Sequence, residues 1–167
     1  MKTNLRTVPL ATPDGIFLAH YSEKGLASLD FPSHRNGKTP VPPGVMPAQI
    51  RQWHRKTAAA LKRSLAGRAP GILPPLDLSG GTDFQQHVWG DLREICSGKT
   101  RSYGEIARAI GKPKAVRAVG GACGANPIPV FVPCHRVLAA NKKIGGFSSG
   151  LNWKRTLLAR EGIGLKG

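Results

Sequence analysis

The sequence predicts a protein of two lobes, an α/β lobe followed by a mostly helical lobe that contains a helix-turn-helix. Short apolar runs separated by turn residues open the chain, and helical periodicity dominates its second half. A stretch rich in Pro and Gly, residues 67–81, lies between the two patterns. We therefore expect a first lobe over residues 1–79, linker included, and a second lobe over residues 80–167.

The first lobe begins with three short runs that are typical of strands, at residues 5–10, 16–20 and 26–31. Pro13-Asp14-Gly15 and Glu23-Lys24-Gly25 supply turns between them, so the runs predict a small antiparallel meander. Residues 32–47 are rich in Pro and Gly and predict a loop. Apolar residues then recur at helical spacing from residue 50 to 65, which predicts a helix that ends at Gly67 and covers the sheet.

The second lobe begins with Thr82, a residue suited to cap a helix, and apolar residues mark one helical face from residue 84 to 95. Ser102 and Glu105 have the spacing of a capping box, which predicts a helix through Ile110. Gly111-Lys112-Pro113 interrupts this helix, and a further helix is expected from about residue 114 to 124. Two helices joined by a short turn with glycine form the pattern of a helix-turn-helix, although many helical hairpins share it.

The charge of the chain favours a polyanionic partner. Lys and Arg number 25 against 9 acidic residues, which gives a formal charge of +16. Nucleic acid is the first candidate, while an ordinary cationic surface gives the same composition. Residues 115–125 of the second helix offer Arg117 as the only long polar side chain, too little to read a base sequence in the major groove. Its small residues suit either a close approach to a minor groove or backbone, or packing inside the lobe.

The three cysteines lack CxxC spacing, which argues against a disulfide framework or a zinc finger and fits a reducing compartment. The first 15 residues lack the apolar core of a signal peptide, and no run approaches the ~20 apolar residues of a membrane span. We therefore expect a cytoplasmic protein, associated with the nucleoid if its source is prokaryotic.

The stretch NPIPVFVPCHRV, residues 126–137, indicates a reactive cysteine. Its apolar run Val130-Phe131-Val132 predicts a buried strand, with Cys134 at the strand end. A free thiol has a pKa of ~8.5, so a working nucleophile needs a base or a positive charge nearby. His135 and Arg136 offer both, but neighbours on a strand face opposite ways, so His135 is expected to act through a water or a local turn. Glu161 is the best carboxylate in this lobe to orient the histidine, whereas Cys96 and Cys123 are expected to be inert.

Several motifs of the second lobe together resemble the methylated-DNA-protein-cysteine methyltransferase family, the O6-alkylguanine-DNA alkyltransferases. The motifs are PCHRV after NPIPVFV, then IGGFSSGLNWKRTLLAREG, and also FQQHVW, SYGEIA and AVRAVGGA, so that the resemblance covers roughly residues 80–163. It implies a ribonuclease-H-like fold for the first lobe and a winged-helix-like fold for the second. No cysteine precedes residue 80, so the zinc of some relatives is not expected, and neither is any other metal or cofactor.

The resemblance also implies a role for individual residues. Cys134 would accept the alkyl group, His135 would act as base through a water, and Glu161 would orient the histidine. Asn126 resembles the hinge between the second helix and the active-site strand. Tyr103 resembles the tyrosine that crowds the target phosphate and helps to protonate the departing guanine, and Arg117 resembles the arginine finger that fills the vacated stack. The resemblance implies further DNA contacts from Ser102, Ala118, Gly121, Ala122 and Arg136. It also implies a base pocket lined by Val137, Ile144, Phe147 and Ser148.

Two residues depart from the family pattern. Phe147 stands where many relatives have tyrosine, and Ser149 replaces a frequent glycine. Both changes bear on the selectivity of the base pocket.

The expected activity is direct-reversal repair of double-stranded DNA. O6-alkylguanine, and also O4-alkylthymine, would be flipped out of the duplex, and its alkyl group would pass irreversibly to Cys134. Each molecule would react once, as a monomer that binds DNA either independently or cooperatively. Three alternatives stay open: a binder that recognises the lesion without removing it, a transcription regulator that uses the helix-turn-helix, and a Cys/His hydrolase. The presence of Cys134 disfavours the binder, and the lack of base-reading side chains disfavours the regulator. The lack of an oxyanion motif disfavours the hydrolase.

Overall fold

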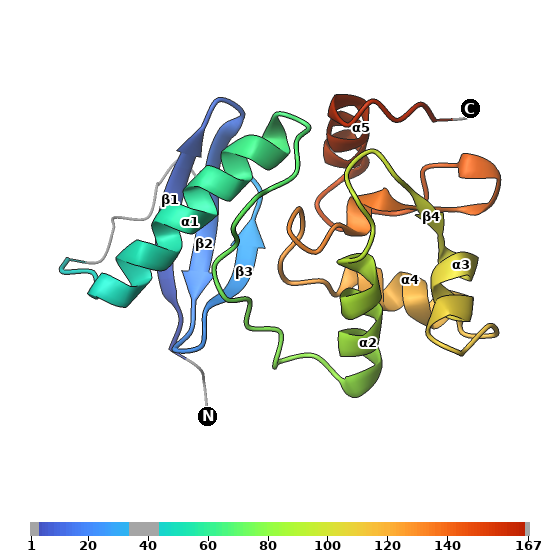
Figure 1. Cartoon of the computed structure of the whole chain (residues 1–167), viewed down its shortest axis with the longest axis horizontal. Coiled ribbons are helices and arrows are strands. Elements are labelled where there is room, and N and C mark those ends of the chain that lie inside the picture. The colour runs from blue at the N-terminus through green and yellow to red at the C-terminus, as the bar shows by residue number, and fades with distance from the viewer. Residues whose placement is uncertain (1–3, 34–43, 166–167) are drawn as a thin grey trace.

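The computed structural model describes residues 4–33 and 44–165. Figure 1 shows a sheet covered by a long helix at one side of the molecule and a group of shorter helices at the other. The three-stranded antiparallel sheet and the helical second half agree with the predicted classes of the two lobes. The division near residue 79 stays a prediction.

The sheet is a meander of β1 (Arg6–Thr12), β2 (Gly15–Tyr21) and β3 (Leu26–Asp30), in that order. The predicted turn is present, and because Thr12 pairs with Gly15 it has Pro13 and Asp14 as its two connecting residues. Gly15 has a φ of 120°, a conformation that is readily accessible only to glycine. The predicted strands were thus confirmed to within two residues at each end.

Helix α1 (Ala48–Leu65) covers the sheet, as predicted, and Gly67 follows it with a φ of 79°. Tyr21 of β2 donates a hydrogen bond to Thr57 Oγ1 across the interface, over 2.9 Å. The Tyr21 hydroxyl also lies 2.7 Å from His54 Nδ1. These polar groups are therefore partnered inside an otherwise apolar layer. Most of the predicted loop over residues 32–47 falls outside the described residues.

The stretch predicted as a linker packs against the sheet. Leu76 forms a parallel bridge with Leu26, flanked by hydrogen bonds from Leu26 N to Pro75 O and from Asp77 N to Leu26 O, over 2.8 and 2.7 Å. A Cβ on Gly25 would lie 2.2 Å from Pro75 O, so only glycine allows this approach. The connection between the lobes is consequently a docked segment.

The second half contains α2 (Asp83–Leu92), α3 (Tyr103–Ala109), α4 (Val116–Gly124) and α5 (Leu151–Arg160). Thr82 and Ser102 form the capping boxes of α2 and α3 with Gln85 and Glu105. The prediction of a helix to Ile95 was wrong, because a turn replaces the helix after Leu92. No helix in residues 4–33 and 44–165 is long and apolar enough to cross a membrane.

The expected strand over residues 130–132 was also wrong. These residues form a turn, and Val130 has a φ of 76°. Cys134 accordingly starts the 3-10 helix η1 (Cys134–Arg136), and the strand β5 (Val137–Leu138) comes after it. β5 pairs in parallel with β4 (Arg101–Ser102), so the start of α3 lies beside the segment that follows the cysteine. A short apolar run between prolines does not distinguish a strand from a buried turn.

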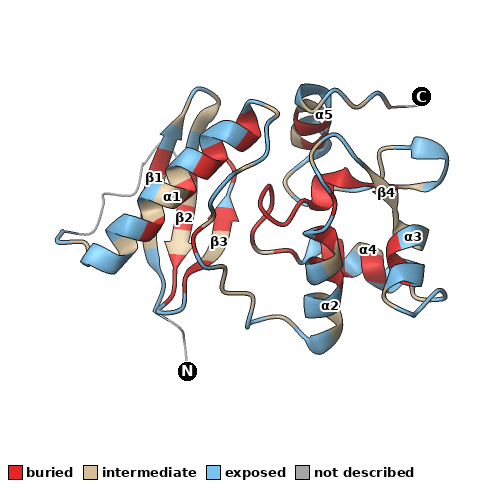
Figure 2. Ribbon diagram, in the orientation of Figure 1, coloured by how far each residue is buried: buried red, intermediate tan, exposed pale blue. Residues whose placement is uncertain are grey.

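The lobes meet at a cluster of aromatic side chains. Phe31, next to the end of β3, has ring centroids 5.2 Å from Phe17, 4.8 Å from Trp153 and 5.8 Å from Phe147. Both halves therefore contribute to one buried core, and Figure 2 shows buried segments on the facing sides of the two halves.

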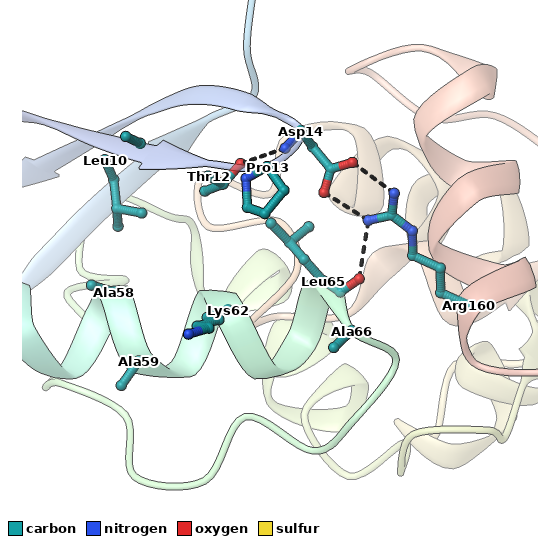
Figure 3. A pocket seen from close by; sticks show the side chains of 11 residues that line it. Leu10, Thr12, Pro13, Asp14, Ala58, Ala59, Lys62, Leu65, Ala66 and Arg160 are labelled. Atoms are coloured by element: carbon teal, nitrogen blue, oxygen red, sulfur yellow. Dashed lines mark hydrogen bonds and ion pairs between the residues drawn. The ribbon is translucent and has the colours of Figure 1, made fainter.

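An ion pair at the surface also links the lobes. Arg160 of α5 donates to both carboxylate oxygens of Asp14, over 2.8 and 2.6 Å, and to Leu65 O over 3.0 Å. Figure 3 shows these contacts at the end of a groove between the β1–β2 turn and α1. The groove contains none of the predicted site residues.

We expect the aromatic cluster to contribute strongly to stability. Phe31→Ala removes a buried ring that contacts both lobes and should lower the free energy of unfolding by about 3–5 kcal/mol. Denaturant unfolding measures the change. Ile72→Ala, at a side chain that is 78% exposed, serves as control and should stay within about 0.5 kcal/mol of the wild type. Equal effects of the two substitutions would contradict this description of the junction.

Candidate alkyl-transfer site

A tight turn between α4 and η1 positions Cys134. Asn126 fixes the turn, because its Nδ2 donates to Val132 O over 2.7 Å and its Oδ1 accepts from Ile128 N over 3.0 Å. A third hydrogen bond, from Val132 N to Ile128 O, supports Val130 in its left-handed conformation. Such a conformation is unfavourable for a β-branched residue and persists only where its surroundings hold it. The structure therefore places Asn126 where the hinge was expected, but before a turn instead of a strand.

The thiol of Cys134 is buried, with 3% of the residue exposed. Burial raises the pKa of Cys134 above its ordinary value, while a hydrogen bond from Asn126 and the charge of Lys154 act in the opposite direction. Deprotonation of this thiol thus depends on the groups around it.

His135 follows in η1 and is almost wholly buried. Burial lowers the pKa of His135 although a hydrogen bond to Glu161 opposes the change, so the imidazole is neutral near neutral pH. Its Nε2 lies 3.0 Å from Glu161 Oε1, which makes Nε2 the protonated nitrogen. Nδ1 is buried and makes no hydrogen bond with residues 4–33 and 44–165, so its lone pair is available to accept a proton.

Glu161 is the C-cap residue that follows α5, and it binds the side chains of His135 and Arg136 in η1. Its carboxylate accepts from His135 and from Arg136, whose Nη2 lies 2.7 Å from Oε1 and whose Nε lies 3.0 Å from Oε2. Burial raises the pKa of Glu161, but the hydrogen bonds and the charges outweigh it and lower the pKa to about 2. The carboxylate is therefore ionised and able to hold the histidine in one tautomer.

Arg136 faces the interior, which corrects its predicted role as a DNA contact. Besides its bonds to Glu161, its Nη1 donates to Ile95 O over 2.6 Å, and its side chain is only 9% exposed. The guanidinium is used to fix the carboxylate, because each of its nitrogens already has an acceptor inside the lobe.

A cavity of about 320 Å³ opens onto the thiol. Of the residues expected at the base pocket, Phe147 and Ser148 line it, and so does Tyr103. Val137 and Ile144 do not. Val137 belongs to β5 and is wholly buried, so its side chain is part of the core. The full lining is Tyr103, Gly120, Cys123, Gly124, Cys134, Gly146, Phe147 and Ser148.

Helix α4 borders the cavity and presents small residues to solvent. Arg117, Ala118 and Gly121 are exposed on it, as a DNA-facing surface requires. Ala122 was placed on this surface by the sequence and is instead buried, with its carbonyl accepting a hydrogen bond from Trp89 Nε1 over 2.8 Å. Ser102 is half-buried, and its side chain caps α3.

Two functional side chains at the site were not predicted from the sequence. Cys123 was expected to be inert, yet it lines the same cavity as Cys134. Lys154 was not considered, and its side chain is wholly buried beside the cavity wall. A signal for Lys154 did exist: it shares one face of α5 with Leu157, Leu158 and Glu161, at helical spacing, and two of these are core leucines.

A buried thiol beside a histidine that a carboxylate orients is the arrangement of proteins that use cysteine as a nucleophile. Comparison with known proteins agrees. Residues 83–163 match the family model described as the 6-O-methylguanine DNA methyltransferase DNA binding domain. A methylated-DNA–protein-cysteine methyltransferase of Methanosarcina acetivorans is 42% identical over 151 residues, which are 90% of this chain and 94% of the relative. The chain belongs to the methylated-DNA–protein-cysteine methyltransferase family.

Solved structures give the same result. A crystal structure of Mycobacterium tuberculosis OGT in complex with DNA superposes with a TM-score of 0.75 at 39% identity, over 94% of this chain and 91% of that one. The O6-methylguanine-DNA methyltransferase of Pyrococcus kodakaraensis shares the fold, with a TM-score of 0.61 at 23% identity over 96% of this chain and 100% of that one. The chain is accordingly a DNA repair protein of the direct-reversal kind, which transfers an alkyl group to a cysteine.

The low pKa of Glu161 predicts how the stability of the protein depends on pH. The ionised carboxylate stabilises the fold above its ordinary pKa of 4.5, and this contribution is lost as the pH falls towards about 2. Glu161→Gln leaves the buried Arg136 without its counter-ion and should lower the free energy of unfolding by about 3 kcal/mol at neutral pH. The deficit relative to the wild type should shrink from pH 4.5 downwards, as measured by urea unfolding at a series of pH values.

Glu94→Gln is the control for this experiment, because Glu94 is exposed. A deficit for Glu161→Gln that did not change with pH would contradict the assignment of the low pKa to Glu161.

Proposed function

We propose that Cys134 is the residue that accepts the alkyl group, with O6-alkylguanine in double-stranded DNA as the substrate. The observation that carries this proposal is the buried chain of contacts from the cysteine turn to His135 and on to Glu161, next to a cavity that opens onto the thiol. Cys96 is exposed and lies outside that cavity. The M. tuberculosis OGT was crystallised in complex with DNA, which supports the same partner for this chain.

The reaction needs one proton acceptor and one donor. The thiol proton leaves towards His135 Nδ1, through a water, while the sulfur attacks the alkyl carbon. A C–S bond forms, the C–O6 bond breaks, and its electron pair stays with the guanine. Burial raises the pKa of Tyr103, so its hydroxyl keeps a proton at neutral pH and is able to donate to the departing base. The thioether has no easy leaving group, so each molecule reacts once.

The base must leave the duplex to reach the cavity, because the thiol is buried. The exposed small residues of α4 allow close contact with a minor groove, and Arg117 lies among them to fill the vacated stack. Flipping costs a few kcal/mol, and less for a poorly paired lesion. The same route serves O4-alkylthymine, which also places its alkyl group on an exocyclic oxygen.

The decisive test locates the transferred group. Incubation with a duplex that carries O6-methylguanine should add one methyl group per protein molecule, and peptide mapping by mass spectrometry should find it on Cys134. Cys134→Ala should leave the lesion in place and still bind the duplex. Lesion removal by Cys134→Ala, or a methyl group on Cys96, would refute the proposal. Tight binding by the wild type without any transfer would instead indicate a lesion binder.

Arg117 is tested by comparing duplex with single-stranded substrate. Arg117→Ala should slow transfer from the duplex by about tenfold or more, the equivalent of one lost contact of about 1–3 kcal/mol. Transfer from a single-stranded oligonucleotide, where no stack has to be filled, should change much less. Arg55→Ala removes an exposed charge from α1 and is the matched control. Equal slowing on both substrates would argue against a finger and for a general loss of affinity.

A further inference from the structure

Lys154 is a charged side chain in the core of the second lobe. It lies in α5, its relative exposure is 0%, and its Nζ donates to Val137 O over 2.7 Å and to Gly146 O over 2.9 Å. Burial is the main cause that lowers the pKa of Lys154, to about 8, so the ammonium form still predominates at neutral pH. A lysine is almost never fully buried unless it is paired.

The structure gives this ammonium no carboxylate partner. None of the ion pairs found across residues 4–33 and 44–165 includes Lys154, and both of its acceptors are neutral carbonyls. A buried charge without a counter-ion is unfavourable. The groups that interact with its charge are the two cysteines of the cavity, because a thiolate at Cys134 or at Cys123 raises the pKa of Lys154.

The two hydrogen bonds of Lys154 also bind together parts of the site that are distant in sequence. Val137 directly follows η1, whereas Gly146 lies nine residues later in the chain and lines the cavity. Its ammonium lies 5.8 Å from the ring centroid of Tyr103, which lines the cavity as well. Gly145 packs so closely on Tyr103 that an added Cβ would lie 2.9 Å from the hydroxyl oxygen. The lysine thus holds one wall of the cavity against β5.

We propose that Lys154 is the counter-ion and a positioning residue of the alkyl-transfer centre. Its ammonium stabilises the thiolate that Cys134 forms during the reaction, and its hydrogen bonds keep the wall at Gly146 in place. Its charge also disfavours a protonated His135, so the histidine stays in the form that accepts the thiol proton. This inference rests on Cys134 as the acceptor, but the test of the counter-ion role needs no alkylated DNA.

Other titratable and charged groups surround the thiol. They come from α3, α4, η1 and the end of α5, and they are Tyr103, Cys123, His135, Arg136 and Glu161. Arg136 and Glu161 neutralise each other in an ion pair, and Tyr103 and Cys123 keep their protons at neutral pH because burial raises their pKa values. Lys154 is therefore the cation among these groups that has no anionic partner before the reaction.

The test measures ionisation of Cys134 directly. Iodoacetamide labelling of each cysteine, resolved by peptide mapping over a range of pH, gives the midpoint for Cys134 separately from Cys96 and Cys123. Lys154→Met removes the charge and keeps an unbranched apolar side chain of similar length. Its Cys134 midpoint should rise, and labelling at neutral pH should slow by about tenfold for each unit of that rise. The difference from the wild type should shrink above about pH 8, where Lys154 itself loses its proton.

Matched variants separate charge from structure. Arg155→Met removes a cation from the neighbouring, exposed position of α5 and should leave the midpoint unchanged. Lys154→Arg retains the charge and should recover most of the labelling rate. Lys154→Gln removes the charge but keeps a hydrogen-bond donor, and it replaces Lys154→Met if that variant does not fold. A folded, charge-free variant with the wild-type midpoint would overturn the counter-ion role.

The wall-holding role has its own readout. Methyl transfer from an O6-methylguanine oligonucleotide should be slowed in Lys154→Met even at a pH where its Cys134 is ionised, since the wall is no longer tied to β5. Full recovery of the transfer rate at that pH would overturn the positioning role and leave the electrostatic one. If wild-type Cys134 titrates as expected but never receives a methyl group, the proposed function fails and the counter-ion role stands.

Discussion

The buried carboxylate of Glu161 is the contact on which the arrangement of the site depends. It accepts hydrogen bonds from His135 and Arg136, the residues that directly follow the cysteine in η1. A carboxylate in an apolar interior is unfavourable unless such partners surround it, and both partners would in turn be unfavourable without it. The residue that follows α5 thereby determines the orientation of a 3-10 turn that lies 25 or more residues earlier in the chain. The chemistry of the cysteine follows from this fixed turn.

Two charged arrangements of opposite character surround the thiol. Glu161 with Arg136 is a closed ion pair whose charges cancel within the core. Lys154 is bonded only to carbonyl oxygens and retains its charge. The ion pair supplies geometry, and the lysine supplies a field that favours negative charge at the cavity. This division of roles is consistent with a neutral His135 that has a free Nδ1.

Much of the fold followed from local signals in the sequence. Turn residues located the meander, and the capping boxes of Thr82 and Ser102 located the starts of α2 and α3, because both signals depend on neighbours within a few residues. The turn at residues 130–132 did not follow, since its conformation depends on the hydrogen bonds of Asn126. The pairing of β4 with β5 joins two-residue strands that are too short for any periodicity.

The site was predictable in its chemistry and less so in its orientation. Cys134, His135 and Glu161 were predicted as site residues from residue type, motif and resemblance, and the structure brings the histidine and the carboxylate together. Arg136 and Ala122 were predicted to lie on the DNA-facing surface and are instead buried, because a motif does not state which way a side chain points. Lys154 was overlooked because a lysine is ordinarily taken as solvated, and its burial depends on packing from distant segments.

The docked connector has a consequence for how the protein meets its substrate. The bridge between Leu26 and Leu76 fixes the connector on the sheet, and the aromatic cluster around Phe31 and the pair of Asp14 with Arg160 join the two halves at two separate places. These contacts oppose relative motion of the two halves. In the proposed mechanism the distortion therefore falls mainly on the nucleic acid, whose stacking and pairing differ between intact and damaged sites.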